Sequence, residues 1–115
     1  MPSARQKYGG LAEDQAVLWL QKNGFHIIAR HVTSRYGEID ILARDGDMIV
    51  AVEVKARRTG QFGRAIESVT PQKLERITLA LDQVMIAREV TNQSTRIDVI
   101  TVEPDGLKHW RGVEA

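Results

Sequence analysis

Two apolar segments joined by a short polar turn constrain the fold of this chain more than any other feature. Residues 37–44 alternate around Ile39 and Ile41, and residues 48–55 are rich in Ile and Val. The Asp-Gly-Asp sequence at 45–47 between them is typical of a turn. Because both segments are too apolar for the edge of a sheet, they predict a β-hairpin at the centre of a sheet.

Hydrophobic periodicity predicts the elements on both sides of this hairpin. Apolar residues at three- and four-residue spacing indicate a helix over 11–23 and a second helix that Thr70 caps, Pro71 begins and residue 89 ends. Short alternating segments predict further strands at 25–30, 96–102 and 107–110, with a loop holding one helical turn at 57–68. The predicted order is αβββαββ, a single α/β domain over 1–115 with a central mixed sheet flanked by helices.

Composition excludes several classes of protein. The chain has 115 residues with 16 Lys+Arg against 15 Asp+Glu, so nucleic-acid affinity must come from local patches rather than net charge. Because Cys is absent, disulfides, thiolate zinc sites and cysteine nucleophiles are excluded, and metal ligands must be Asp, Glu or His. The longest apolar run, 48–52, is far short of the ~20 residues of a membrane span. We expect a cytoplasmic protein with no membrane association.

Three charged residues interrupt the two apolar strands. Asp40 lies in the first strand, and Glu53 and Lys55 lie in the second. Since side chains alternate between the faces of a strand, Glu53 and Lys55 share a face. Burial of such charges requires mutual pairing or a bound cation. The alternative is an ordinary salt-bridged pair on a solvated face of the sheet.

The register of the hairpin decides whether Asp40 and Glu53 meet. If Arg44 pairs with Met48 across a three-residue turn, the two acids miss each other. Pairing of Arg44 with Ile49 instead places them opposite each other, with Cβ atoms about 5 Å apart, which suits two carboxylates on one hard cation. A metal site therefore predicts the second register, reached through a longer turn or a bulge.

Another acid comes from the first predicted helix. Glu13 lies on the same helical face as the apolar stripe of Ala16, Val17 and Leu20, so it points towards the sheet. An acid near the start of a helix also complements the helix dipole, so both interpretations of Glu13 stay open.

These residues carry a family resemblance. Gly-Glu-Ile-Asp at 37–40, followed by Val-Glu-Val-Lys-Ala-Arg at 52–57, resembles the signature of the YraN-like family of small bacterial proteins. That family belongs to the PD-(D/E)XK nuclease superfamily and is similar to archaeal Holliday junction resolvases, which implies a restriction endonuclease-like fold. Further matching positions are Glu13, Gly24-Phe25, Gln72-Lys73 and 96–99. Two positions depart from the superfamily pattern without removing a ligand: Ile39 replaces Pro, and Ala12 replaces Gly.

The resemblance implies a role for each matching residue. It assigns Asp40, Glu53 and Glu13 as ligands of Mg²⁺ or Mn²⁺, and Lys55 as the residue that orients or activates the attacking water. Gln72 stands where some relatives place a glutamine that faces the site. Such an ion binds a phosphate oxygen and lowers the pKa of bound water.

Charges of one sign follow the metal-binding strand. From residue 54 to residue 66 the charged residues are Lys55, Arg57, Arg58 and Arg64, while the acids, Glu38 among them, gather where a cation would lie. These cations, extended by Arg30, Arg35, Lys73 and Arg76, would bind phosphates of a nucleic acid. The alternative is a solvated loop. Tyr36 and Phe62 are better explained as loop anchors than as residues that stack on bases.

The remaining polar residues give no further site. His26, His31 and His109 lack metal-ligand spacing and are interpreted as structural or surface residues. Asp98 interrupts an apolar strand, and the sequence leaves open whether it is a network partner of the site or an aspartate at an edge or turn.

The leading functional hypothesis is a metal-dependent endonuclease that acts on DNA, including branched DNA. The second is a nucleic-acid-binding module of the same fold without efficient catalysis, and the third is a subunit that docks a partner protein. Resolvase-like enzymes act as symmetric dimers, so a homodimer stays open, although no sequence feature identifies a dimer face.

Overall fold

The structure, a computed structural model, describes residues 4–58 and 63–114. Its elements are α1 (Ala4–Lys22), β1 (His26–Ser34), β2 (Gly37–Asp45), β3 (Met48–Ala56), a short 3₁₀ helix (Ala65–Ser68), α2 (Pro71–Ala87), β4 (Thr95–Glu103) and β5 (Gly106–Trp110). The predicted order αβββαββ is therefore confirmed. Phe62, considered above as a loop anchor, lies outside the described residues.

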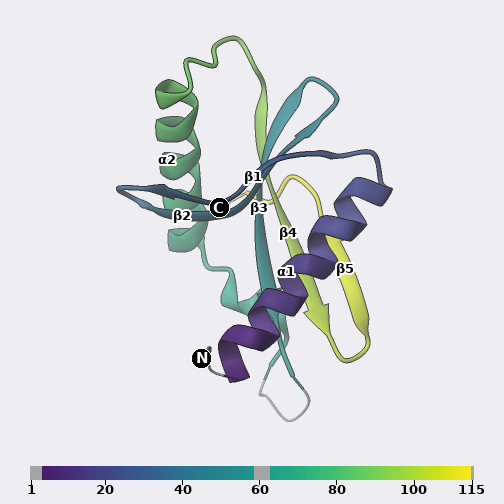
Figure 1. Ribbon diagram of the computed structural model, residues 1–115. Helices are drawn as coiled ribbons and strands as arrows, with labels where there is room; N and C mark the ends of the chain where they lie inside the picture. The colour runs from purple at the N-terminus through teal and green to yellow at the C-terminus, as the bar shows by residue number, and fades with distance from the viewer. Residues whose placement is uncertain (1–3, 59–62, 115) are drawn as a thin grey trace.

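The five strands form one mixed sheet in the order β1-β2-β3-β4-β5. Neighbouring strands are antiparallel except β3 and β4, which are parallel. Parallel neighbours need a crossover connection, and α2 supplies it. Figure 1 shows α1 and α2 on opposite sides of the strands, with the β4–β5 hairpin beside α1.

The β2–β3 hairpin has the register that a metal site requires. Arg44 pairs with Ile49, as predicted, but the turn is shorter than expected because Asp45 also pairs with Met48. Only two residues remain in the turn, and the first, Gly46, has a φ of +60°. Glycine at the first position of a two-residue turn adopts this conformation without a steric cost, so the strands extend further than the sequence indicates.

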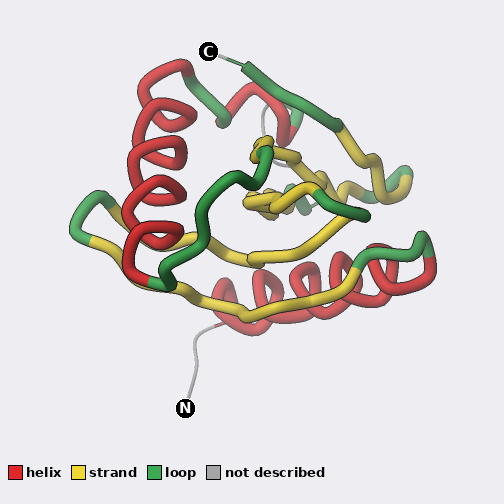
Figure 2. The backbone as a smooth tube through the Cα atoms, turned by 90° about the horizontal axis from the view of Figure 1, so that it is seen from above, coloured by secondary structure: helices red, strands yellow, loops and turns green. Residues whose placement is uncertain are grey.

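Each face of the sheet carries its own hydrophobic core. The core under α2 includes Ile39, Leu42, Ala51, Leu74, Ile77 and Leu81. The core under α1 includes Ala16, Leu20, Ile41, Val50, Val52 and Ile100. Figure 2 shows the two helices on either side of the strands. Because β2 and β3 are covered on both faces, they are apolar throughout, apart from the charges of the candidate site.

Element boundaries differ from the predictions mainly near the N-terminus. α1 begins at Ala4 rather than residue 11, and β1 continues to Ser34 rather than ending at residue 30. β1 extends because it pairs with β2 along its length, with a bulge between Ile27 and Ala29. Among the described residues, no helix is both long and apolar enough to cross a membrane.

Candidate active site

The candidate site lies where β2 and β3 separate. The last paired residues are Ile41 and Val52, so the pairing stops just short of Asp40 in β2. Ile39 packs under α2 whereas Ile41 packs under α1, although residues two apart on a regular strand share a face. β2 therefore twists sharply at Asp40, and the backbone N–H of Val54 donates a hydrogen bond of 2.8 Å to the Asp40 carboxylate.

Glu53 lies on the face of β3 that α2 covers. Its side chain is buried, and Oε1 lies 3.4 Å from the Nζ atoms of both Lys55 and Lys73. Lys55 shares this face because of strand alternation, as predicted. Lys73 belongs to the first turn of α2, where its backbone N–H donates to the Thr70 hydroxyl at the helix cap. One carboxylate oxygen is thus held between two ammonium groups.

The carboxylates and lysines of this site perturb one another. Burial, and then the charge of Glu53, raises the pKa of Asp40 to about 6, and Glu13 adds to the rise. Burial and the neighbouring ammonium of Lys73 lower the pKa of Lys55, although Glu53 opposes the change. Like charges that disfavour each other's ionised forms mark a candidate functional site.

Glu13 is buried on α1 and is held by two residues of β1. Its Oε1 lies 2.8 Å from Nε of Arg30 and 2.9 Å from Nε2 of His31. The other ring nitrogen of His31, Nδ1, lies 2.7 Å from the Glu38 carboxylate. Because ionised carboxylates only accept hydrogen bonds, His31 satisfies both of them as an imidazolium. The bond with Glu38 accordingly raises the pKa of His31.

The structure brings some of the predicted ligands together and keeps others apart. Glu53 and Lys55 meet, and Asp40 is near enough for Glu53 to shift its pKa. Glu13 acts on Asp40 electrostatically but bonds to β1. Within residues 4–58 and 63–114, no three Asp, Glu or His side chains converge in a geometry that could hold a metal ion. Each acid instead faces a cation or an N–H group of the protein.

A cleft of about 450 Å³ opens beside Glu53, between α2 and the tip of the β1–β2 hairpin. Residues that line it include Tyr36, Glu38, Glu53, Gln72, Lys73 and Arg76. The sequence placed Gln72 and Glu38 around the site, and both residues contribute to this cleft. The candidate site therefore has a cavity next to its charged residues, as binding sites generally do.

The predicted phosphate-binding residues fall into two groups. Arg57 and Arg58 directly follow β3, and the backbone N–H of Arg57 donates to Val102. The guanidinium of Arg64 instead lies 2.9 Å from Glu103 and 3.1 Å from Asp105. In the structure the charge of Arg64 therefore fastens the loop to the β4–β5 hairpin, and its phosphate-binding role stays a prediction.

Sequence reasoning missed the contribution of β1 to the site. The sequence indicates only that Arg30 extends a basic patch and that His31 is a structural or surface residue. Their contact with Glu13 follows a bulge in β1, after which His31 adopts a φ of +53°. Neither residue spacing nor charge pattern signals such a bulge. The ion pair between Lys73 and Glu53 had a partial signal in the helix start at Thr70 and Pro71.

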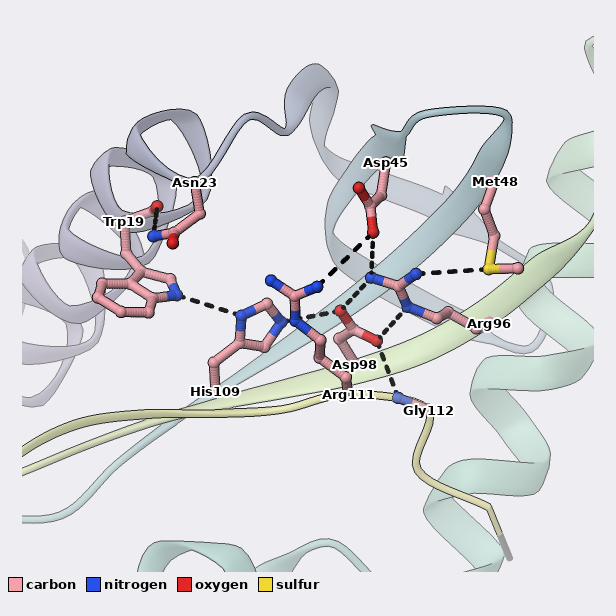
Figure 3. A network of polar contacts seen from close by, with 9 residues as sticks. All are labelled: Trp19, Asn23, Asp45, Met48, Arg96, Asp98, His109, Arg111 and Gly112. Atoms are coloured by element: carbon pink, nitrogen blue, oxygen red, sulfur yellow. Dashed lines mark hydrogen bonds and ion pairs between the residues drawn. The ribbon is translucent and has the colours of Figure 1, made fainter.

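Asp98, whose role the sequence left open, belongs to a separate network under α1. It pairs with Val52 across the parallel ladder, so it lies on the opposite face of the sheet from Glu53. The Asp98 carboxylate is fully buried and accepts hydrogen bonds from Arg96 at 2.8 Å and from the Gly112 N–H at 3.0 Å (Figure 3). Asp98 is therefore neither a partner of the candidate site nor an edge residue.

His109 connects this network to α1. The Trp19 indole N–H donates to His109 Nδ1 at 3.1 Å, and His109 Nε2 lies 2.8 Å from Asp98 (Figure 3). Since the indole only donates, Nδ1 accepts, and His109 carries its proton on Nε2. Burial alone would raise the pKa of Asp98, but the bonds from His109, Arg96 and Gly112 lower it to about 2.

Fold and site together define an α/β domain with a carboxylate-and-lysine site where a mixed sheet separates. Residues 12–102 match the family described as uncharacterised protein family UPF0102. The chain belongs to this family, the YraN-like family that its motifs resemble.

Relatives of similar length share most of the chain. A UPF0102 protein of Neisseria meningitidis is 36% identical over 104 residues, which is 90% of each chain. One from Mycolicibacterium vanbaalenii is 41% identical over 86% of this chain and 82% of its own. One from Pelotomaculum thermopropionicum is 38% identical over 89% of this chain and 85% of its own. The similarity therefore extends across both cores and the candidate site.

Proposed function

We propose that the protein is a metal-dependent endonuclease that hydrolyses phosphodiester bonds of DNA, including branched DNA. The observation that carries the proposal is the buried Glu53 carboxylate, held between Lys55 and Lys73 at a cleft and electrostatically coupled to Asp40. The resemblance to PD-(D/E)XK nucleases supports the same assignment.

The oxygen chemistry of the proposed ligands suits a hard divalent cation, although no three acids or histidines of the described residues converge on one point. Asp40, Glu53 and Glu13 would hold Mg²⁺ or Mn²⁺, both of which prefer carboxylate oxygens. Burial and the charges of Glu53 and Glu13 raise the pKa of Asp40, which means that they disfavour its ionised form. A cation beside these acids would offset this cost of ionisation. When bound, the ion supplies a polarised phosphate oxygen and an acidified water molecule.

Lys55 is the residue proposed to handle the water molecule. Its Nζ lies beside Glu53, and its lowered pKa increases the fraction of neutral amine at a given pH. A neutral amine accepts a proton from the attacking water, and the ammonium form orients the water or the phosphate. Glu53 positions this nitrogen through the 3.4 Å contact.

Lys73 is proposed to bind the phosphate next to the bond that is cut. Lys73 lines the cleft, and its Nζ lies 3.4 Å from Glu53 Oε1. Arg57 and Arg58, at the end of β3, extend this positive charge along the DNA backbone. The near-neutral net charge is therefore compatible with a local DNA-binding surface.

A cleavage panel tests the proposal. Linear, nicked, flapped and four-way DNA are incubated with purified protein and either Mg²⁺ or Mn²⁺. We expect cleavage of at least one form, and loss of roughly 10²–10⁴-fold in rate with Lys55→Met, the range for removal of a proton-transfer group. Glu53→Gln should also abolish cleavage. Glu75→Gln and Lys108→Met, at exposed positions on α2 and β5, are the matched controls.

Metal binding separates this proposal from a non-catalytic nucleic-acid-binding module. Calorimetric titration with Mn²⁺ should show binding to the wild type that Asp40→Asn and Glu53→Gln weaken. Salt-sensitive DNA binding without metal binding or cleavage would overturn the nuclease and support the module.

A further inference from the structure

We propose that the cleft between α2 and the β1–β2 hairpin holds one unpaired nucleotide, with its base stacked on Tyr36 and its phosphate on Lys73 and Arg76. The inference rests on the proposed nuclease function and specifies its substrate class: DNA with an unpaired strand beside the cut, rather than continuous duplex.

The size of the cleft supports a single nucleotide. Its volume of about 450 Å³ falls within the range of about 300–1,000 Å³ for small-ligand sites. A double helix, whose major groove alone is about 12 Å wide, does not enter such a space. Glu53 is part of the lining, so a nucleotide in the cleft lies directly beside the candidate catalytic residues.

The two walls of the cleft differ in charge. Lys73 and Arg76 are three residues apart on α2, which places both cations on one side of that helix. The opposite wall, at the hairpin tip, carries Tyr36 and the acid Glu38. Glu38 is paired with His31 and gives a phosphate no attraction, whereas the cations of α2 attract it, so the phosphate faces α2 and the base faces the hairpin.

Hydrogen bonds from the backbone fix the turn that carries Tyr36. Its backbone N–H donates to the Ser34 hydroxyl at 3.1 Å, and the N–H of Arg35 donates to Gln83 on α2 at 2.9 Å. These bonds fix the hairpin tip, while the residue itself stays 39% exposed. The turn is therefore fastened by its backbone, and part of the Tyr36 residue stays accessible at the cleft.

The Tyr36 ring also has the surroundings of a stacking platform. The Arg35 guanidinium lies 5.4 Å from the ring centroid, a cation–π contact that restrains the aromatic side chain. A restrained, exposed ring stacks on any base, because every base has a flat face. Recognition of an unpaired nucleotide by this ring is therefore independent of sequence.

Binding in EDTA tests the inference without cleavage. The probes are a fluorescein-labelled duplex and the same duplex with a single-stranded extension that carries 2-aminopurine. We expect wild type to prefer the extended probe and to quench the 2-aminopurine by stacking. Tyr36→Ala should lower the ratio of the two affinities about 10-fold, which corresponds to about 1.4 kcal/mol of stacking, and should remove the quenching. Tyr36→Phe, which retains the ring, should preserve both.

The basic wall has its own matched pair of variants. Arg76→Ala should weaken binding of the extended probe, whereas Arg88→Ala, at the opposite end of α2, should not. Equal binding of both probes, or a ratio that Tyr36→Ala leaves unchanged, overturns the inference even if the wild type cleaves DNA. Selective binding and quenching without cleavage in Mg²⁺ or Mn²⁺ instead upholds the cleft and overturns the nuclease.

Discussion

Asp40 combines a structural bond with an electrostatic penalty. Its carboxylate accepts the Val54 N–H at the point where β2 no longer supplies a carbonyl partner. The same carboxylate has its pKa raised to about 6 by burial and by Glu53. Near neutral pH the ionised form therefore destabilises the folded state, although the hydrogen bond stabilises it.

Substitutions of Asp40 separate these two effects. Asp40→Asn keeps an acceptor for Val54 and removes the charge, so we expect the free energy of unfolding at pH 7 to rise by about 1 kcal/mol. Asp40→Ala leaves the Val54 N–H without its acceptor and should unfold at a lower urea concentration than Asp40→Asn. Urea titration checks both, and an Asn variant less stable than the Ala variant would contradict the assignment.

The alternation of side chains predicted that Glu53 and Lys55 share a face of β3. The residue types also predicted the hairpin register that brings Asp40 towards them. They did not predict the support from β1, because Arg30 and His31 reach Glu13 only after a bulge and a positive φ at His31. Such local backbone geometry is set by pairing with β2 rather than by the residues themselves. The ion pairs of Arg64 were not predicted either, since its acidic partners lie far along the chain, at the β4–β5 hairpin.

At the scale of elements, the strong periodic patterns were the predictable ones. The β2–β3 hairpin and α2 were predicted closely, because apolar alternation and the Thr70-Pro71 start are both local signals. The extension of β1 to Ser34 was not, because it depends on backbone pairing with β2. The segment 30–34 has a single apolar residue, Val32, and so gives no alternation from which a strand could be predicted.

The first turn of α2 joins stability to the candidate site, since the cap at Thr70 and the Lys73 ammonium are three residues apart. Thr70→Ala removes the hydroxyl that accepts the Lys73 N–H, so we expect a loss of about 1 kcal/mol in the free energy of unfolding. Thr70→Ser retains a hydroxyl acceptor, so its free energy of unfolding should stay close to that of the wild type. Chemical denaturation measures both, and equal stability of the Ala and Ser variants would argue against a cap.

At the scale of the whole molecule, the two faces of the sheet carry different polar groups. The face under α2 holds Glu53, Lys55 and the cleft, where like charges perturb each other. The face under α1 holds Asp98, whose partners are Arg96, His109 and a backbone N–H. The first arrangement favours ligand binding, and the second favours stability of the fold.

The Asp98 network predicts a pH dependence of stability. Its folded pKa of about 2 lies below the ordinary value of 3.8, so its contribution is present above pH 4 and is lost as the pH falls towards 2. The difference between these two pKa values corresponds to about 2 kcal/mol in the free energy of unfolding. The stability gap between wild type and Asp98→Asn, measured by denaturation across this range, should narrow by about that amount. A gap that stays constant from pH 6 to about 2 would contradict the ion pairing.

The contacts of Gly112 and Val113 also bear on when the protein can finish folding. The Gly112 N–H binds Asp98, and the Val113 N–H binds the carbonyl of Ile97. Chains emerge from the ribosome starting at the N-terminus, so Trp19 and Asp98 are both synthesised before these donors exist. Without Gly112 in place the buried Asp98 carboxylate lacks one of its hydrogen bonds, so the segment after β5 completes this network. A chain that ends before Gly112 would keep the Asp98 carboxylate one donor short even when β4 and β5 are paired.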